Sequence, residues 1–279
     1  MNLLQVLSNG YNILKSNKIE SYKIDTELIL CQSLNISREE LILNLNKKID
    51  SKDYKKFQNN IDRRKAKEPV AYIMQKKEFW KNEFYISKNV LIPRPESEHL
   101  IEETLKLITK NQNKNLLDIG VGSGCLIISI LKDRKNCFGT GIDCCGKAVK
   151  IANINANLHK IRDRIKISKS NVDNFKSGKY DLIISNPPYI DKHQLKYLDV
   201  SEHEPLQALD GGINGVEVLI KVILKASQLL KINGKLIIEI GKNQKYKVVK
   251  LLNKNNFFVN KIVKDLSNLD RCIISTKLR

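Results

Sequence analysis

The sequence predicts an α/β fold, in which a mainly parallel β-sheet is covered by helices on both faces and follows a helical region. After residue 114, short apolar runs typical of buried strands alternate with stretches typical of helices. The predicted strands span residues 115–119, 138–142, 165–168, 182–185, 235–240, 257–263 and 272–276. The predicted helices among them span residues 126–131, 147–158, 215–230 and 244–252. The last two strands have little sequence between them, so we expect them to be antiparallel.

Residues 1–75 form the first predicted unit, a small helical bundle. Apolar residues recur there at helical spacing, and no glycine follows Gly10 within it. The segment from Ser37 to Glu40 has the pattern of a capping box, in which a serine and a glutamate close the first turn of a helix. A further helix opens at Ser51 and is expected to end near Pro69.

Between Pro69 and Pro95 the pattern changes to short, aromatic-rich pieces that favour β structure. These pieces are Val70 to Ile73, Phe79 and Trp80, Phe84 to Ile86, and Val90 to Ile92. We interpret them as a connector that carries a β-hairpin. Pro95 then suits the first turn of a helix whose amino end is rich in glutamate. The predicted domains are residues 1–75, a helical domain; 76–95, the connector; and 96–279, the α/β domain.

The composition excludes several classes of protein. The 279 residues can bury a sizeable core. They contain no apolar run of about 18 residues and no basic leader, so we expect a cytoplasmic protein with no membrane association. The six cysteines and four histidines lack metal-ligand spacing, so we expect no metal site. The formal charge of +19 is spread along the chain, which favours a compositional bias, although an anionic partner stays compatible with it.

A strand that ends at a proline corner is the first chemical feature. The apolar run that begins at Asp181 stops at Asn186, Pro187, Pro188 and Tyr189. Because two prolines cannot continue a sheet ladder, the corner lies at the carboxyl end of the strand. Each proline restricts its own backbone and that of the residue before it, so the turn is rigid.

This corner has the groups needed to hold a planar amino group. Asn186 has a side-chain oxygen that accepts hydrogen bonds, and the Pro187 carbonyl lacks local donors. Together they can accept both hydrogens of an amide or an amino-heterocycle, while Tyr189 stacks on its flat face. Asn186, Pro187 and Tyr189 are therefore the candidate catalytic residues, and Pro188 joins them in substrate binding. The alternative is a plain proline turn.

A glycine-rich turn between the first strand of the sheet and a helix is the second feature. Its glycines let the backbone approach a ligand closely, and the helix that follows offers unpaired N–H groups. Asp143, at the end of the next strand, is placed to accept hydrogen bonds from ribose hydroxyls. This arrangement serves nicotinamide dinucleotides and S-adenosylmethionine alike. The candidate cofactor-binding residues of the turn are Gly120, Val121, Gly122, Ser123 and Gly124.

Three details favour S-adenosylmethionine. The glycine spacing misses the Gly-x-Gly-x-x-Gly pattern that suits a pyrophosphate. Asp118, just before the turn, would repel a diphosphate but suits an amino-acid ammonium group, although it could instead cap a helix or loop. The corner at Asn186 is predicted one strand over, where an acceptor nitrogen would meet a methyl group. Asn186 is therefore also a candidate cofactor-binding residue.

The chain resembles the HemK-type protein-(glutamine-N5) methyltransferases that act on peptide chain release factors. The resemblance covers nearly the whole length, and the Ile-Pro-Arg-Pro-Glu segment from residue 92 to residue 96 is much more specific than the corner, which other amino methyltransferases share. The matching segments are Glu68 to Ile73, Lys77 to Trp80, Leu91 to Glu98, Asp118 to Gly124, Asn186 to Tyr189, Glu204 and Pro205, Ala208 to Gly212, Glu239 to Gly241, and Asp265 to Ser267.

This resemblance implies a class I S-adenosylmethionine-dependent methyltransferase with a Rossmann-like, seven-stranded mixed sheet. It implies that the glycine turn and Asp143 bind S-adenosylmethionine, and that the corner binds the glutamine of the Gly-Gly-Gln loop of a class I release factor. Asn171 and Val172 match the positions beside the adenine, where the family usually has an acidic residue and a larger apolar one. The helical domain is implied to help grip the release factor. We expect a monomer without stable nucleic acid binding.

Three alternative functions fit parts of the sequence. An adenine-N6 methyltransferase acting on DNA or RNA would share the corner and suit the charge, but no large insertion is available to read or flip a base. A dinucleotide-dependent oxidoreductase is disfavoured by the glycine spacing. A non-enzymatic protein that keeps the fold for binding fits poorly, because the cofactor turn and the acceptor corner are both intact.

Overall fold

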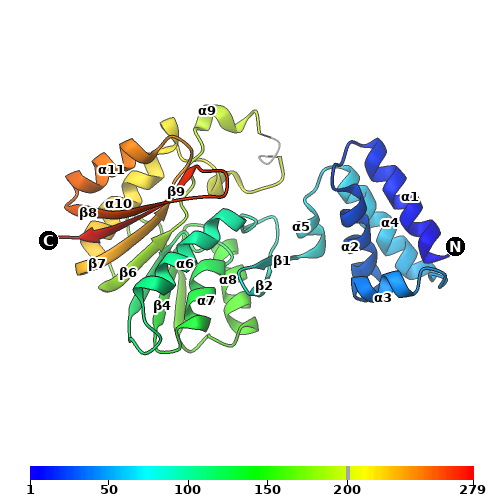
Figure 1. Cartoon of the computed structure of the whole chain (residues 1–279), viewed down its shortest axis with the longest axis horizontal. Helices are drawn as coiled ribbons and strands as arrows, with labels where there is room; N and C mark the ends of the chain where they lie inside the picture. The colour runs from blue at the N-terminus through cyan, green and yellow to red at the C-terminus, as the bar shows by residue number, and fades with distance from the viewer. Residues whose placement is uncertain (199–201) are drawn as a thin grey trace. The chain divides into compact units, whose positions relative to one another are not determined.

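The structure, a computed structural model, describes residues 1–198 and 202–279, and the chain divides into two units, Met1–Lys76 and Lys77–Arg279. The first unit is helical and the second is α/β (Figure 1). Each unit has its own apolar cluster of buried residues, so each can be described by itself. No helix in the described ranges is long and apolar enough to cross a membrane.

The first unit confirms the predicted helical bundle. Its helices are α1 (Leu3–Ser16), α2 (Tyr22–Leu34), α3 (Arg38–Leu43), α4 (Ser51–Lys65) and α5 (Val70–Met74). The capping box before α3 is present: the Ser37 hydroxyl accepts from the backbone N–H of Glu40 at 3.1 Å, and the Glu40 carboxylate accepts from that of Ser37 at 2.9 Å. A buried ion pair between Asp25 and Arg64, 2.7 Å long, links α2 to α4.

Two predicted β pieces of the connector are wrong. Val70 to Ile73 belong to α5, because Pro69 is the helix N-cap and the helix packs Val70 and Ile73 against the bundle. Val90 to Ile92 form no strand: the backbone N–H of Ile92 donates to the carboxylate of Glu204 at 3.0 Å rather than to another strand. An apolar run this short cannot by itself separate strand from helix.

The predicted hairpin is confirmed as β1 (Lys76–Phe79) and β2 (Asn82–Tyr85). It is fastened to the α/β unit by hydrogen bonds that its turn and second strand make. The Trp80 backbone N–H donates to Glu98 at 2.7 Å, and its indole N–H donates to Asp133 at 3.2 Å. Tyr85 donates its backbone N–H to the side-chain oxygen of Asn155 at 2.8 Å.

The second unit confirms the predicted seven-stranded mixed sheet, with strand order β5-β4-β3-β6-β7-β9-β8. Within this sheet, the described pairs β7–β9 and β8–β9 are antiparallel and the other described pairs are parallel. The strands are β3 (Asn115–Ile119), β4 (Phe138–Asp143), β5 (Ile165–Lys169), β6 (Tyr180–Ser185), β7 (Leu230–Glu239), β8 (Phe257–Lys264) and β9 (Asp270–Lys277). Helices α6, α7 and α8 cover one face and α10 and α11 the other (Figure 1).

The helices of this unit lie close to their predicted positions. They are the 3-10 turn η1 (Pro95–Ser97), α6 (Glu98–Leu107), α7 (Cys125–Asp133), α8 (Gly146–Leu158), α9 (Lys192–Leu195), η3 (Leu206–Ala208), η4 (Ile213–Gly215), α10 (Glu217–Leu229) and α11 (Lys245–Lys254). The predicted helix at 215–230 begins later, because Gly215 has a left-handed φ of 66°. The segments α9, η3 and η4 were not predicted.

The strand order places both chemical features at one crevice. The chain runs from β3 to β4 and β5 on one side, then returns to β6 on the other side of β3. Ligands of open α/β sheets bind outside the carboxyl ends of strands at such a switch point. The glycine turn follows β3 and the proline corner follows β6, so the two features meet there.

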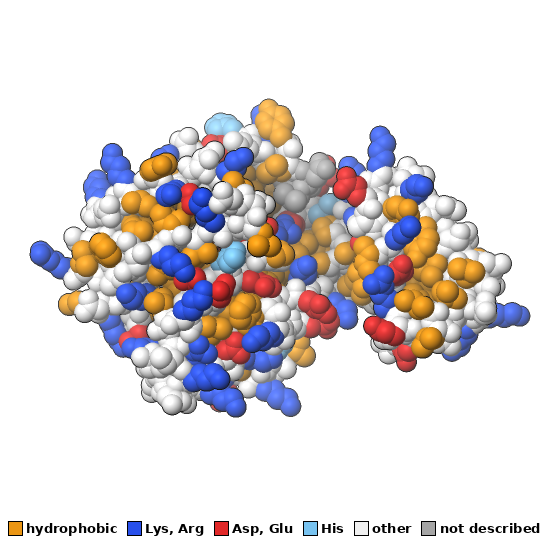
Figure 2. Space-filling model, in the orientation of Figure 1, with side chains coloured by type: hydrophobic (Ala, Val, Ile, Leu, Met, Phe, Trp, Pro, Cys, Tyr) orange, Lys and Arg blue, Asp and Glu red, His pale blue; other side chains and the backbone are white. Residues whose placement is uncertain are grey.

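The charged side chains are dispersed on the face shown in Figure 2, where lysines and arginines lie among acidic and uncharged residues. The formal charge of +19 is therefore not gathered into one basic block on this face.

Candidate active site

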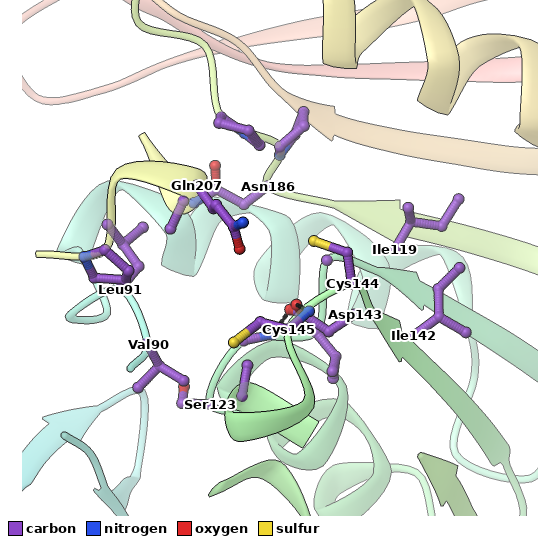
Figure 3. A pocket seen from close by; sticks show the side chains of 18 of the residues that line it. Val90, Leu91, Ile119, Ser123, Ile142, Asp143, Cys144, Cys145, Asn186 and Gln207 are labelled. Atoms are coloured by element: carbon purple, nitrogen blue, oxygen red, sulfur yellow. Dashed lines mark hydrogen bonds between the residues drawn. The ribbon is translucent and has the colours of Figure 1, made fainter. Parts of the chain in front are cut away.

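A cavity of about 330 Å³ opens at the carboxyl ends of β3, β4 and β6. Figure 3 shows Asn186 and Gln207 on one side of it and Ser123, Asp143 and Cys145 on the other. The segment from Asn89 to Arg94 and the amino-terminal half of α10 complete the wall. The cavity is largely apolar with a few polar groups, the usual make-up of a small-molecule site.

The glycine turn forms a cradle in the floor of the cavity. Gly120, Gly122 and Gly124 have φ angles of 82°, 53° and 83°, which favour glycine over every other residue. A Cβ atom at Gly120 would meet no atom within 4 Å, whereas one at Gly124 would lie 2.7 Å from Ile128 in α7. The first glycine therefore leaves space for a ligand, and the third lets the helix pack closely.

Asp143 borders the cavity from the end of β4, as predicted for a ribose-binding residue. One carboxylate oxygen accepts from the backbone N–H of Gly122 at 3.0 Å, and the other accepts from that of Cys145 at 2.8 Å. Burial raises the pKa of Asp143, and these two backbone donors act in the opposite direction. The Cys144 thiol also hydrogen-bonds this carboxylate, which leaves one lone pair that a ligand hydroxyl can use.

Asp118 lies in β3, directly before the glycine turn. It is fully buried and does not belong to the described residues that line the cavity. Neither of its oxygens makes a hydrogen bond of normal geometry in the described part of the chain, but the backbone N–H of Ile127, in the first turn of α7, interacts with its carboxyl. Burial, and then the negative charge of Asp143, raise the pKa of Asp118 to about 8, while the nearby backbone N–H of Ile127 lowers it. Its contact with an ammonium group stays a prediction.

The proline corner brings Asn186, Pro187 and Pro188 to the cavity wall. The side-chain NH2 of Asn186 donates to the hydroxyl of Ser97 at 2.9 Å. That hydroxyl in turn donates to Oε2 of Glu239 at 2.6 Å.

Tyr189 lies apart from the described cavity-lining residues. Its ring packs beside Gly241, and its backbone oxygen accepts from the side chain of Gln244 at 2.9 Å. Its hydroxyl interacts with the carboxyl of Glu239. Burial, and then the negative charge of Glu239, raise the pKa of Tyr189. Its stacking on a substrate amide stays a prediction.

Asn171 and Val172 line the cavity after β5, where they were expected. Asn171 is exposed, whereas Val172 also packs against the core beneath α10. Their contacts with an adenine ring stay predictions.

Four polar residues that border or support the site were not among the predicted catalytic or binding residues, although the sequence placed Arg94 and Glu204 beside the pocket. Arg94 forms an ion pair with the buried carboxylate of Glu204, which ties two loops of the cavity wall together. Ser97 and Glu239 support Asn186 from behind, although they lie 142 positions apart. No local sequence pattern links residues at such separations. The sequence therefore indicates these residues only through the segments that carry the family resemblance.

Three thiols border the cavity, from Cys125, Cys144 and Cys145. Burial raises the pKa of Cys125 to about 12, so it is protonated at neutral pH. Across the described residues, no group of histidine, cysteine, aspartate and glutamate is placed to hold a metal ion.

Comparison with known proteins gives matches over both units. Residues 5–74 match the family model of the PrmC N-terminal domain, and residues 97–202 match that of the methyltransferase small domain. The release factor glutamine methyltransferase of Fusobacterium nucleatum is 36% identical over 98% of this chain and 78% of its own length. That of Clostridium acetobutylicum is 31% identical over 99% of both chains.

Among solved structures, a methyltransferase from Pyrococcus furiosus aligns with a TM-score of 0.55, over 80% of this chain and 98% of its own. A ribosomal protein L11 methylase from Lactobacillus delbrueckii aligns with a TM-score of 0.52, over 72% of this chain and 91% of its own. Their sequence identities, 20% and 18%, establish a shared fold alone.

Proposed function

The chain belongs to the release factor glutamine methyltransferases, and from this premise we propose that it transfers a methyl group from S-adenosylmethionine to a release factor glutamine. The acceptor is the side-chain amide nitrogen N5 of the glutamine in the Gly-Gly-Gln loop of class I release factors. One observation carries the chemistry: the glycine cradle and the acceptor corner open into the same cavity.

The residues around the cavity fit S-adenosylmethionine. The open space at Gly120 accepts a ligand close to the backbone, and Asp143 has a lone pair for a ribose hydroxyl. Asn171 and Val172 would border the adenine, and Asp118 would balance the ammonium group from below the turn. When bound, S-adenosylmethionine supplies an electrophilic methyl group on a positively charged sulfur.

The corner supplies what an amide nitrogen needs in order to react. Its lone pair is delocalised into the carbonyl, so the nitrogen is a weak nucleophile and must be held and tuned. We assign the Asn186 side-chain oxygen and the Pro187 carbonyl as acceptors of its two hydrogens, which aim the nitrogen at the methyl group. They also stabilise the positive charge that develops on nitrogen. We assign Tyr189 to stack on the plane of the substrate amide. After methyl transfer, the nitrogen loses its proton to water.

The test of this function is the mass of the release factor peptide that contains the loop glutamine, after incubation with enzyme and S-adenosylmethionine. We expect one added methyl group on that glutamine. Asn186→Ala should lower turnover by about 100-fold, the usual effect of losing one electrostatic contact in a transition state. Asn253→Ala, an exposed substitution in α11, is the matched control. Full turnover by Asn186→Ala would remove Asn186 from the mechanism.

The same assay separates this function from its alternatives. An adenine-N6 methyltransferase would transfer labelled methyl groups to DNA or RNA and leave the release factor unlabelled. A non-enzymatic binding protein would bind S-adenosylmethionine and transfer nothing. We further propose a cytoplasmic monomer that forms no stable complex with nucleic acid, which size-exclusion chromatography with and without RNA would test.

A further inference from the structure

A chain of hydrogen bonds leads from the acceptor corner into the protein core. Asn186 donates to Ser97 at 2.9 Å, and Ser97 donates to Glu239 at 2.6 Å. Ser97 is 3% exposed and Glu239 is 1% exposed, so water does not compete for these bonds. The function proposed above assigns no role to Ser97 or Glu239.

The direction of these hydrogen bonds decides whether the oxygen or the NH2 group of the Asn186 side chain faces a ligand. A serine hydroxyl has one hydrogen, and an ionised carboxylate only accepts. Because Ser97 gives its hydrogen to Glu239, Ser97 can only accept from Asn186, and the NH2 group must face Ser97. The side-chain oxygen is left over: within the described residues no donor reaches it, and Asn186 lines the cavity.

We propose that Ser97 and Glu239 are positioning residues, which orient the Asn186 side chain so that its oxygen, not its NH2, is offered to the substrate amide. With its amide reversed, Asn186 would present donors to the donor NH2 of glutamine and could not hold it. The inference rests on the proposed function, since it explains how the corner selects an amide nitrogen.

Glu239 also interacts with Tyr189, so both ends of the corner depend on one buried carboxylate. The titratable and charged groups that face Glu239 are Tyr189, Arg271, Cys272 and Glu96. Burial raises the pKa of Glu239 to about 7, although the hydrogen bonds from Ser97 and Tyr189 and the charge of Arg271 lower it. Below that pH, protonated Glu239 can donate to Ser97, which frees the serine hydrogen to turn toward the Asn186 oxygen.

The kinetic test compares Ser97→Ala, Ser97→Thr and Glu239→Gln with the wild-type protein. Ser97→Ala should lower kcat by about tenfold, the effect of one hydrogen bond, with little change in the KM for S-adenosylmethionine. Ser97→Thr keeps the hydroxyl and should restore most of the rate. Wild-type kcat should fall as pH drops through about 7, and Glu239→Gln should lack this fall.

Two variants of buried residues outside the site serve as controls. Ser129→Ala removes a buried hydroxyl in α7, and Glu103→Gln neutralises a buried carboxylate in α6. Both should keep the wild-type kcat and its pH dependence. The proposal is overturned if Ser97→Ala turns over at the wild-type rate, if Ser97→Thr is as slow as Ser97→Ala, or if Glu239→Gln keeps the wild-type pH profile.

A spectroscopic readout tests the orientation even if the protein methylates nothing. In protein labelled with ¹⁵N-asparagine, the side-chain NH2 signal of Asn186 is identified by its absence in Asn186→Ala. We expect this signal to titrate with an apparent pKa near 7 in the wild-type protein and to stay constant with pH in Ser97→Ala and Glu239→Gln. A signal that does not respond to pH in the wild-type protein would refute the positioning role, whereas missing methylation with a normal titration would refute only the proposed function.

Discussion

Asp118 is an acidic side chain in β3, the strand that leads into the glycine turn. Its carboxylate is fully buried beneath the glycine turn, and neither oxygen makes a hydrogen bond of normal geometry in the described residues. Buried charges are costly unless they are paired. Because the pKa of Asp118 is raised to about 8, the folded protein keeps this carboxyl protonated below that pH. A cation in the cavity would favour the ionised form and release that proton.

The stability of the folded protein should depend on pH through Asp118. The folded pKa of Asp118 lies above its unfolded value of about 4, so the folded state binds the extra proton between these limits. The free energy of unfolding therefore falls as pH rises from about 4 to about 8. Asp118→Asn should flatten this fall, measured as the unfolding temperature at several pH values, while the exposed substitution Asp163→Asn should not. Parallel curves for Asp118→Asn and the wild-type protein would contradict this.

At the scale of elements, the turn between β3 and α7 divides two tasks between its glycines. Gly120 borders the cavity and has free space where a side chain would begin. Gly124 has the same left-handed backbone, but a side chain there would point toward Ile128 of α7 and Ala152 of α8. One glycine therefore leaves open space at the cavity, and the other allows close helix packing.

Gly120→Ala and Gly124→Ala should separate these tasks. Both place a Cβ on a left-handed backbone, which should lower the free energy of unfolding by about 1–2 kcal/mol. Gly124→Ala should lower it further, because its Cβ would lie 2.7 Å from Ile128. Gly120→Ala should also weaken the binding of S-adenosylhomocysteine by about tenfold or more, because its methyl group occupies ligand space. Gly124→Ala should bind nearly as well as the wild-type protein. Calorimetric titration measures the affinity of both variants for S-adenosylhomocysteine. Equal losses of affinity would show that the turn acts only through its overall shape.

At the scale of the whole molecule, the chain consists of two units with separate cores. The helical unit buries its own apolar cluster, which includes Leu3, Leu30 and Phe57, and its described residues contribute none of the cavity wall. The α/β unit contains the cradle and the corner. We infer that the helical unit contributes to the recognition of the release factor and not to methyl transfer itself.

Removal of residues 1–76 should therefore raise the KM for the intact release factor by more than about tenfold, because contacts worth over about 1.4 kcal/mol are lost. The affinity for S-adenosylhomocysteine should stay within about twofold. Circular dichroism and thermal unfolding of the shortened chain check that the α/β unit is folded. If cofactor affinity falls as much as release factor recognition, then the helical unit supports folding instead.

The sequence alone predicted most of the elements, because their signals are local. Periodicity, capping residues and breakers located all seven strands of the large sheet and the main helices, although β7 begins at Leu230, five residues before its predicted start. The errors came where local signals are ambiguous. The run from Val70 to Ile73 suits a strand and a helix alike. It forms a helix because this conformation packs it against the bundle. Likewise the apolar run that ends at Ile92 is held by the distant carboxylate of Glu204, which no neighbouring residue announces.

The sequence by itself determined the two chemical features, since the glycine turn and the proline corner are each contiguous and depend on backbone restrictions that act between neighbours. Only the tertiary structure decided that both open into one cavity, that Asp118 lies beneath it, and that Ser97 and Glu239 meet behind Asn186. The physical reason is that hydrogen-bond direction and burial are properties of side chains brought together from distant strands and turns, and the local pattern around each one contains no record of its partner.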